Sequence, residues 1–228
     1  MSKNHIWIVL AAYNEAQTIS NVLNDLIQYP YQIIVVDDGS EDNTSELALA
    51  FPVTVLRHIC NLGQGAALQT GISYALLQSD TQAIATFDAD GQHNPEEIVH
   101  LLEPVLSGAV DVALGTRFAH SDNAINMPFT RRMMLKAAIW YTRRSTRLTL
   151  TDTHNGFRAF SAAGAKKIQI SSNRMAHASE ILNQISKHKL RYQEIPVTIR
   201  YTDYSLSKGQ SVFEFINILW EIISGGIR

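Results

Sequence analysis

The sequence has a single cysteine, six prolines and no marked excess of charge of either sign. Cys60 alone cannot close an intrachain disulfide, and a structural zinc site would need paired cysteine ligands. The formal net charge of −2 differs from the strongly basic balance of nucleic-acid-binding proteins, so no nucleic-acid partner is expected. Long hydrophobic runs are absent as well, because no stretch approaches the ~20 apolar residues that span a bilayer. These absences favour a cytosolic protein.

The sequence is rich in apolar side chains, which make up 46% of the 228 residues, whereas charged side chains make up 18%. Such a composition is typical of a globular domain with a sizeable core and excludes a disordered or fibrous chain. No linker rich in proline, glycine or serine divides the sequence, which predicts a single domain over residues 1–228. Within it, residues 1–118 are regular in pattern, residues 119–210 are less so, and residues 211–228 are unusually apolar for a chain end.

Short β-branched runs alternate with helical patterns through the first half of the chain. The pattern predicts strands at 6–11, 33–36, 53–57, 83–87 and 110–114, with helices at 17–28, 42–50, 65–77 and 95–106. Strands that are apolar throughout are typical of a sheet covered on both faces. The alternation predicts an α/β fold with a mostly parallel, doubly wound central sheet, in which ligands bind beyond the carboxyl ends of the strands.

Acidic residues follow two of these predicted strands. Asp37 and Asp38 open the segment DDGSEDNT, which fits either a ligand-facing turn or a helix cap, since Asp and Ser are favoured in both. Asp88, Asp90 and Gln92 lie two residues apart in FDADGQH, so in an extended segment their side chains project to one side. Oxygen ligands of this kind suit Mg²⁺ or Mn²⁺ bound jointly with substrate phosphates, whereas a solvated acidic turn is the alternative.

Two further segments have both a functional and a structural interpretation. The glycine-rich NLGQGAALQTGI, with Gly63 and Gly65, lacks the third glycine of a dinucleotide fingerprint and the Lys-Ser/Thr of a P-loop, so it also fits a helix packed closely on the sheet. Residues 123–151 contain six Lys or Arg and no acid. On a helix over 131–147, four of them would form a cationic stripe: Arg132, Lys136, Arg143 and Arg147. Such a stripe suits a phosphate or an anionic membrane surface, or is simply solvated.

Together, these segments resemble the family 2 glycosyltransferases, most closely the dolichyl- and polyprenyl-phosphate sugar synthases. The resemblance covers nearly the whole chain and rests on motifs in the order and spacing of that family: AAYNE, VVDDGSEDNT, NLGQGAALQTGI, FDADGQH, LGTR, DTHNGFRAF, SEIL, EIPV and SKGQS. It implies a nucleotide-diphospho-sugar transferase fold of the GT-A, Rossmann-like type, inversion at the anomeric carbon, and a divalent metal, Mg²⁺ or Mn²⁺.

The resemblance also implies residue roles. Asp88, Asp90 and Gln92 would hold the metal, and Arg117 would approach phosphate, together with Arg131 and Arg132 on the acceptor side. Residues 1–118 would form the nucleotide-sugar-binding half and residues 119–210 the acceptor half. The nucleotide-sugar would contact the segments after the strands and before one helix, through Ala12, Tyr13, Glu15, Asp37, Asp38, Gly39, Gly63, Gly65, Asp88 and Ala89.

The sequence departs from the family's motifs at two positions that concern the acceptor. The family's Ser four residues after an Arg is absent, since Leu135 and Lys136 follow Arg131 and Arg132, and the family's Ser before Gly-Phe is Asn155 here. Asp88, Asp90 and Arg117 are the candidate catalytic residues. A lipid phosphate needs no general base, whereas a sugar hydroxyl needs one, for which Asp152 and Glu180 are candidates.

The expected function is metal-dependent transfer of a sugar from a UDP- or GDP-sugar to a polyprenyl phosphate at the cytoplasmic face of a membrane. The alternatives are transfer to a sugar hydroxyl in cell-surface polysaccharide synthesis and a non-catalytic nucleotide-sugar-binding subunit. Residues 211–223 form an amphipathic pattern with an acidic polar face. That pattern could dock on the core, on the membrane, on a small membrane protein or on a second copy of the chain.

Overall fold

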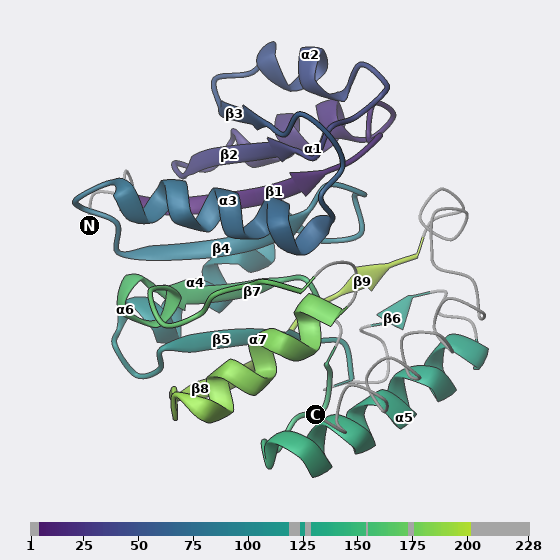
Figure 1. The fold of residues 1–228 in the computed structure, drawn as a ribbon, viewed down its shortest axis with the longest axis vertical. Coiled ribbons are helices and arrows are strands. Elements are labelled where there is room, and N and C mark those ends of the chain that lie inside the picture. The colour runs from purple at the N-terminus through teal and green to yellow at the C-terminus, as the bar shows by residue number, and fades with distance from the viewer. Residues whose placement is uncertain (1–4, 119–123, 126–128, 154, 173–175, 202–228) are drawn as a thin grey trace.

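A sheet of seven strands forms the centre of the protein, in the order β3-β2-β1-β4-β7-β5-β8. The computed structural model describes residues 5–118, 124–125, 129–153, 155–172 and 176–201 (Figure 1). The strands are β1 (Ile6–Ala12), β2 (Gln32–Asp37), β3 (Thr54–Arg57), β4 (Ala83–Asp88), β5 (Val112–Thr116), β7 (Arg158–Ser161) and β8 (Tyr192–Pro196). Only β7 runs antiparallel to its two neighbours, β4 and β5, so the expected mostly parallel α/β sheet is confirmed.

Helices cover both faces of this sheet. One face carries α1 (Ile19–Leu26), α2 (Thr44–Leu49) and α4 (Ile98–Leu106), whereas the other carries α3 (Gln64–Leu77), α6 (Ala162–Ala165) and α7 (Ala176–Lys187). In Figure 1 α3 and α7 lie in front of the sheet. The long α5 (Phe129–Thr146) packs against α7, and β6 (Ala124–Ile125) pairs with β9 (Ile199–Arg200) in a separate small sheet. No helix in the described ranges is both long and apolar enough to cross a bilayer.

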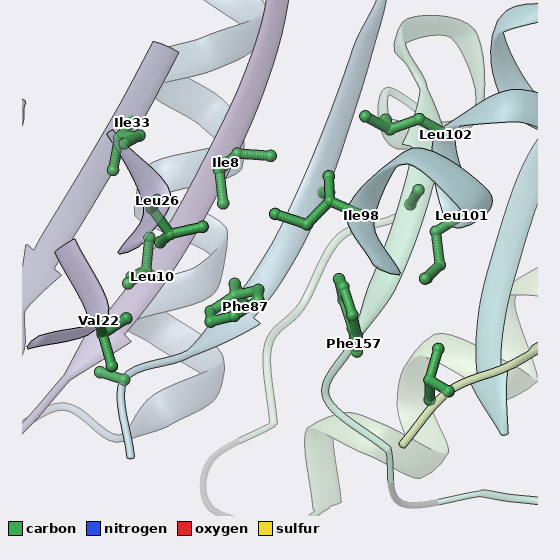
Figure 2. Packing of buried hydrophobic residues seen from close by; sticks show 14 of the residues in the cluster. Ile8, Leu10, Val22, Leu26, Ile33, Phe87, Ile98, Leu101, Leu102 and Phe157 are labelled. Carbon is green, nitrogen blue, oxygen red and sulfur yellow. The ribbon is translucent and has the colours of Figure 1, made fainter. Parts of the chain in front are cut away.

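Strand alternation divides the core into two layers, one on each side of the sheet. Ile8 and Leu10 of β1 and Phe87 of β4 face α1 and α4, and Val9 and Ile84 face α3 and α7. Figure 2 shows the first layer, where side chains of α1 and α4 pack against those of the strands. The apolar character of both strand faces, expected from the continuous runs, follows from this double cover.

Several element bounds differ from the predicted ones for local reasons. The strand predicted at 110–114 begins later, at Val112, because the backbone N–H of Val110 donates to Pro104 at the end of the preceding helix. The start of the predicted 95–106 helix is a 3-10 turn, Pro95–Glu97, capped by the Asn94 side chain. The helix predicted at 131–147 ends at Thr146, since Arg147 has a positive φ of 61°.

Strand β7 was missed by the sequence patterns. Its four residues, RAFS, are too few to show a period, and an arginine at its first position hides its burial. The residues 211–228, for which an amphipathic helix was predicted, lie outside the described part of the chain.

The core layer between α4 and the sheet is expected to contribute strongly to stability. Leu101 is fully buried, so Leu101→Ala should lower the free energy of unfolding by about 2–5 kcal/mol through lost burial and a residual cavity. Leu77, at the end of α3, is 80% exposed, and Leu77→Ala makes the same chemical change with an expected effect within about 0.5 kcal/mol. Urea unfolding of both variants tests this, and equal losses would contradict the assigned packing.

Candidate active site

The acidic strand ends meet at one edge of the sheet. β1 pairs in parallel with β2 on one side and β4 on the other, with Ala12 opposite Asp37 and Ala11 opposite Asp88. Strand β5 runs parallel to β4 across β7, so Arg117, the residue after β5, lies at the same edge. The sheet therefore brings together residues from both halves of the chain, as ligand sites in doubly wound sheets require.

The loops after β1 and β2 are tied to each other by side-chain hydrogen bonds. The N–H of Asn14 donates to Ser40 Oγ at 2.9 Å, and the N–H of Glu15 donates to Thr44 Oγ1 at 2.8 Å. In return, Asn14 Oδ1 accepts from the N–H of Glu41 at 2.9 Å. The Tyr13 side chain beside these contacts is 40% exposed, so an aromatic ring is presented to solvent at the site.

Asp37 and Asp38 have different environments although they are adjacent. Asp37 is fully buried, and its Oδ1 accepts from the N–H of Ser40 while Oδ2 lies 3.3 Å from Arg57 Nε. Asp38 binds the loop before α3, since its oxygens accept from the N–H groups of Leu62 and Gly63 at 2.9 and 2.7 Å. His58 Nδ1 is 2.7 Å from the same carboxylate. Asp38 thus fixes the glycine-rich loop rather than presenting a free carboxylate.

The glycines of this region permit close backbone approaches. Gly39 has a φ of +72°, and a Cβ there would lie 2.5 Å from the carbonyl carbon of Cys60. At Gly65, near the start of α3, a Cβ would lie 2.2 Å from the Ser172 carbonyl oxygen. Both glycines are therefore needed to pack loops tightly around the strand ends, and Gly63, directly before α3, has a positive φ of 95° that also favours glycine. This supports the structural interpretation of the glycine-rich segment.

Asp88 at the end of β4 is held from two sides. Its Oδ2 lies 2.9 Å from His93 Nε2, and its Oδ1 accepts from Gln64 Nε2 at 3.1 Å. A Cβ on Gly156 would lie 2.5 Å from Oδ2, so only glycine leaves room for the carboxylate. Burial disfavours the charge of Asp88, but the hydrogen bond and charge of His93 and the charges of His177 and Arg158 outweigh it and lower its pKa.

The pKa of Asp90 is shifted in the opposite direction to that of Asp88. Its oxygens accept from the backbone N–H of Gln92 at 3.1 Å and from Gln92 Nε2 at 2.7 Å. Burial, followed by repulsion from Asp88 and with a smaller contribution from Glu15, raises the pKa of Asp90 to about 6. The amide nitrogen of Gln92 faces Asp90, which leaves its amide oxygen as the atom able to ligate a cation. Ala89, between the two acids, is buried.

These residues fit a divalent cation that is shared with a ligand. Asp88 and Asp90 repel each other, and Asp90 has no cationic partner in the described ranges, so a cation between them would relieve the repulsion. Among the described residues, no group of three or more His, Cys, Asp and Glu side chains could hold a metal by itself. Phosphate oxygens would have to complete the coordination, as is usual for Mg²⁺.

Arg117 and Asp152 form a buried ion pair. Arg117 Nε donates to Asp152 Oδ2 at 2.6 Å, and the Arg117 backbone N–H donates to the same oxygen at 3.1 Å. Arg117 Nη1 also donates to the Tyr201 hydroxyl at 2.7 Å. Glu194 of β8 fixes this loop by accepting from the N–H groups of Thr151 and Asp152. Burial opposes the charge of Arg117, but Asp152 and Tyr201 outweigh it and raise its pKa.

Glu180, the other candidate base, caps a loop. Its carboxylate accepts from the N–H groups of Ser171 and Ser172 at 2.9 and 2.8 Å and from the Ser171 hydroxyl at 2.5 Å. Partial burial favours the protonated form, but these hydrogen bonds outweigh it and lower the pKa of Glu180. The structure therefore places Glu180 in a structural role at α7.

The acceptor-side arginines are only partly described. Arg132 on α5 is exposed, whereas the side chain of Arg131 lies outside the described residues. Arg143 lies further along the same helix and donates through Nε to the Leu150 carbonyl oxygen.

The glycosyl transferase family 2 model matches residues 7–169. The chain belongs to this family. A UDP-N-acetylglucosamine–dolichyl-phosphate N-acetylglucosaminyltransferase of Methanococcus voltae is 30% identical, over 98% of this chain and 96% of the relative. A polyprenol monophosphomannose synthase of Mycolicibacterium smegmatis is 30% identical, over 97% and 86%. An uncharacterized protein of Methanocaldococcus jannaschii is 40% identical, over 98% and 93%.

The fold agrees with this membership. Glucosyl-3-phosphoglycerate synthase of Mycobacterium tuberculosis, solved with Mn²⁺, UDP-glucose and phosphoglyceric acid, superimposes with a TM-score of 0.72 at 17% identity, over 96% of this chain and 77% of that chain. The expected GT-A fold is confirmed, and the protein is a nucleotide-sugar-dependent glycosyltransferase.

Some contacts of the site were not foreseen from the sequence. His93, directly after the metal-binding candidates Asp88, Asp90 and Gln92, lies with its Nε2 2.9 Å from Asp88 Oδ2. Gln64 and Arg158 were not singled out, although both lie near the same carboxylate. The histidine directly after the acidic segment was the available signal for His93, whereas Gln64 and Arg158 are adjacent to Asp88 only through the tertiary fold.

The raised pKa of Asp90 predicts a pH-dependent stability. Because the folded state binds this proton more tightly than the unfolded chain, ionised Asp90 destabilises the metal-free fold, with the cost appearing as pH rises from about 4 to about 6. Asp90→Asn should therefore be more stable than the wild type at pH 7.5, by up to roughly 2–3 kcal/mol, and lose this advantage near pH 4. Urea unfolding with a chelator present measures both.

Asp111, whose pKa is lowered rather than raised, provides the control. Its ion pair with Arg191 lowers its pKa, so Asp111→Asn should destabilise the protein at pH 7.5 and have less effect as pH falls through the lowered pKa. A pH-independent difference between Asp90→Asn and wild type would show that the Asp90 carboxylate is not under electrostatic strain.

Proposed function

We propose that the protein transfers a sugar from a UDP- or GDP-sugar to a polyprenyl phosphate, with inversion at the anomeric carbon and with Mg²⁺ or Mn²⁺ bound. The names of the relatives from M. voltae and M. smegmatis support a dolichyl- or polyprenyl-linked acceptor. A solved neighbour holds Mn²⁺ and UDP-glucose, which supports the metal and the donor class. Asp88, Asp90 and Gln92 would hold the metal, and the loops after β1 and β2 would hold the nucleoside.

The proposed reaction is a direct displacement. An oxygen of the acceptor phosphate attacks the anomeric carbon, the bond from that carbon to the diphosphate oxygen breaks, and the nucleoside diphosphate leaves with the electron pair. The metal supplies charge neutralisation for the diphosphate. The protein contributes the positioning of both reactants at the sheet edge, where β1, β2 and β4 end.

The observation that carries a phosphate acceptor, rather than a sugar hydroxyl, is the state of the two candidate bases. Asp152 is fully buried and ion-paired with Arg117. Glu180 accepts hydrogen bonds from Ser171 and Ser172, which lower its pKa. A general base needs a free carboxylate within reach of the proton that it removes. An acceptor phosphate is already anionic and needs no base. A phosphate acceptor is therefore consistent with a site in which neither Asp152 nor Glu180 is free to act as a base.

The exposed face of α5 has the composition of a helix that binds an anionic membrane surface. Met133 and Trp140, seven residues apart and so on one side of the helix, are 53% and 71% exposed. Exposed cations surround them on the same helix, at Arg132, Lys136 and Arg144. Exposed apolar side chains among Lys and Arg are typical of helices that lie in a membrane interface. We propose that α5 contacts the cytoplasmic leaflet, where the lipid acceptor would be presented.

Asp90→Ala should abolish transfer while leaving the fold intact. The loss of one metal-binding carboxylate is expected to lower the turnover rate by at least roughly a hundredfold, because the diphosphate would leave without full charge neutralisation. The measurement is release of UDP or GDP from a panel of sugar nucleotides, with a short-chain polyprenyl phosphate and Mg²⁺ or Mn²⁺. Asp25→Ala, an exposed acid on α1, should keep wild-type turnover.

Two results would argue against the proposal. Wild-type turnover of Asp90→Ala with metal present would refute the metal assignment. Transfer by the wild type only to free sugars or lipid-linked oligosaccharides would favour a hydroxyl acceptor.

Trp140→Ala should weaken binding to vesicles that contain anionic lipid. Sedimentation with phosphatidylglycerol vesicles is expected to show a several-fold loss, because an exposed indole contributes to interfacial binding. Leu77→Ala removes an apolar side chain of similar exposure, 80% against 71%, from a helix without this cationic surround, and should bind as the wild type does. Equal losses in both variants, or no loss in either, would refute the α5 assignment.

A further inference from the structure

Arg158, at the start of β7, is a buried cation with little to compensate its charge. It is 4% exposed, and Nη2 donates to the Thr153 carbonyl oxygen at 3.4 Å. Within the described part of the chain, this is the only hydrogen bond of the guanidinium, and no carboxylate lies within 4.0 Å of it. A guanidinium carries five N–H donors, and burying a cation without partners is costly.

The buried Arg117 has stronger partners than Arg158. Arg117 is similarly buried, at 5% exposed, but its Nε is 2.6 Å from Asp152 Oδ2 and its Nη1 is 2.7 Å from the Tyr201 hydroxyl. The two arginines lie at the same sheet edge in similarly dry surroundings. Of these two arginines, Arg117 alone has a carboxylate within 4.0 Å among the described residues.

The position of Arg158 is at the candidate active site. In the sheet it lies opposite Thr86 of β4 and Leu114 of β5, two residues before the ends of both strands. Burial lowers the pKa of Arg158 to about 10, and the charges of Asp88 and Asp152 partly oppose this. Its side chain shares the sheet face of Phe160, which packs toward α3 and α7. The cation therefore lies between the two acidic ends of the site, on the face covered by the helices.

The two nearest acids already have other partners. Asp88 is bound by His93 and Gln64, and Asp152 is bound by Arg117. Neither forms a direct ion pair with Arg158. The described residues supply no further counter-ion. The substrates of the proposed reaction are phosphates, for which a guanidinium provides matched paired donors.

We propose that Arg158 binds a phosphate oxygen of a substrate, either the diphosphate of the nucleotide-sugar or the phosphate of the acceptor. The proposal rests on the proposed function for the acceptor phosphate, but binding of a nucleoside diphosphate tests it without any acceptor. Arg158 is a substrate-binding residue that has no carboxylate partner in the described part of the empty protein, at a cost in stability that the bound phosphate offsets.

This assignment gives a signature that a structural arginine would not give. Arg158→Met replaces the guanidinium with an apolar side chain of similar length, so the empty protein should melt at the wild-type temperature or a few degrees higher. The same variant should bind UDP or GDP roughly 10- to 100-fold more weakly, because charge-assisted hydrogen bonds to phosphate are lost. Removing a structural arginine would lower the melting temperature and leave phosphate affinity unchanged.

The experiment uses the full chain and has two arms. Calorimetric titration with UDP and GDP in Mn²⁺ gives the diphosphate affinity, with uridine and guanosine as probes of the nucleoside alone. Steady-state transfer to a short-chain polyprenyl phosphate gives the KM for the acceptor. Arg158→Lys keeps a charge but not the paired donors and should recover part of the lost affinity. Arg191→Met removes an exposed arginine directly before β8, at the edge of the sheet opposite the candidate site, and should leave both arms unchanged.

The outcomes separate the possibilities. Weaker UDP or GDP binding by Arg158→Met, with nucleoside binding and melting temperature retained, supports a diphosphate ligand. A raised acceptor KM with unchanged UDP and GDP affinity supports the acceptor phosphate. Affinity within twofold of wild type in both arms overturns the proposal, whatever the melting temperature. A fall in the melting temperature of Arg158→Met that Arg158→Lys reverses without recovering any affinity indicates a structural arginine and overturns the proposal, as does an equal loss of nucleoside and diphosphate binding. Failure to transfer sugar to polyprenyl phosphate would refute the proposed function but leave the diphosphate arm valid.

Discussion

Negative charge gathered at one sheet edge is the constraint on which the rest of this structure depends. Four acids lie at that edge, where neighbouring backbone and helices limit their contact with water. Asp37 and Asp88 end strands β2 and β4, and Asp90 and Asp152 lie in loops. Asp37 is compensated by Arg57, Asp152 by Arg117, and Asp88 by His93 and Gln64. Asp90 has no cationic partner among the described residues, and burial and the charge of Asp88 raise its pKa. The surplus of charge is thereby confined to the place where a divalent cation would bind.

Carboxylates at this edge also hold loops in place. Asp38 accepts from the N–H groups of Leu62 and Gly63, and Glu194 accepts from those of Thr151 and Asp152. Carboxylates that accept several backbone hydrogen bonds fix the geometry of the loops that donate them. The ligand-facing residues are therefore mounted on loops that are rigid before any ligand arrives, which reduces the ordering cost of binding.

Local patterns were sufficient to predict the strands that precede the acids and the edge at which the acids meet. Continuous apolar runs identified β1, β2 and β4, and the two-residue spacing of Asp88 and Asp90 identified the metal-binding candidates. The pattern could not distinguish Asp37 from Asp38, because the partners of Asp38 come from a loop more than twenty residues away. For the same reason β7 and Arg158 were missed, since the burial of a four-residue strand is created only by β4 and β5 on either side.

The distribution of partners also bears on the acceptor. A hydroxyl acceptor would need a carboxylate that is both ionised and unoccupied, yet Asp152 is ion-paired and Glu180 caps a loop. Asp90 has a pKa of about 6, suitable for a base, but its place beside Asp88 makes it a metal ligand candidate first. Away from Asp88 and Asp90, the site offers cations: the guanidinium of Arg158, which has no carboxylate within 4.0 Å among the described residues, and the exposed cations of α5. A site with cations and without a free general base among these carboxylates suits a nucleophile that is already anionic, such as an acceptor phosphate.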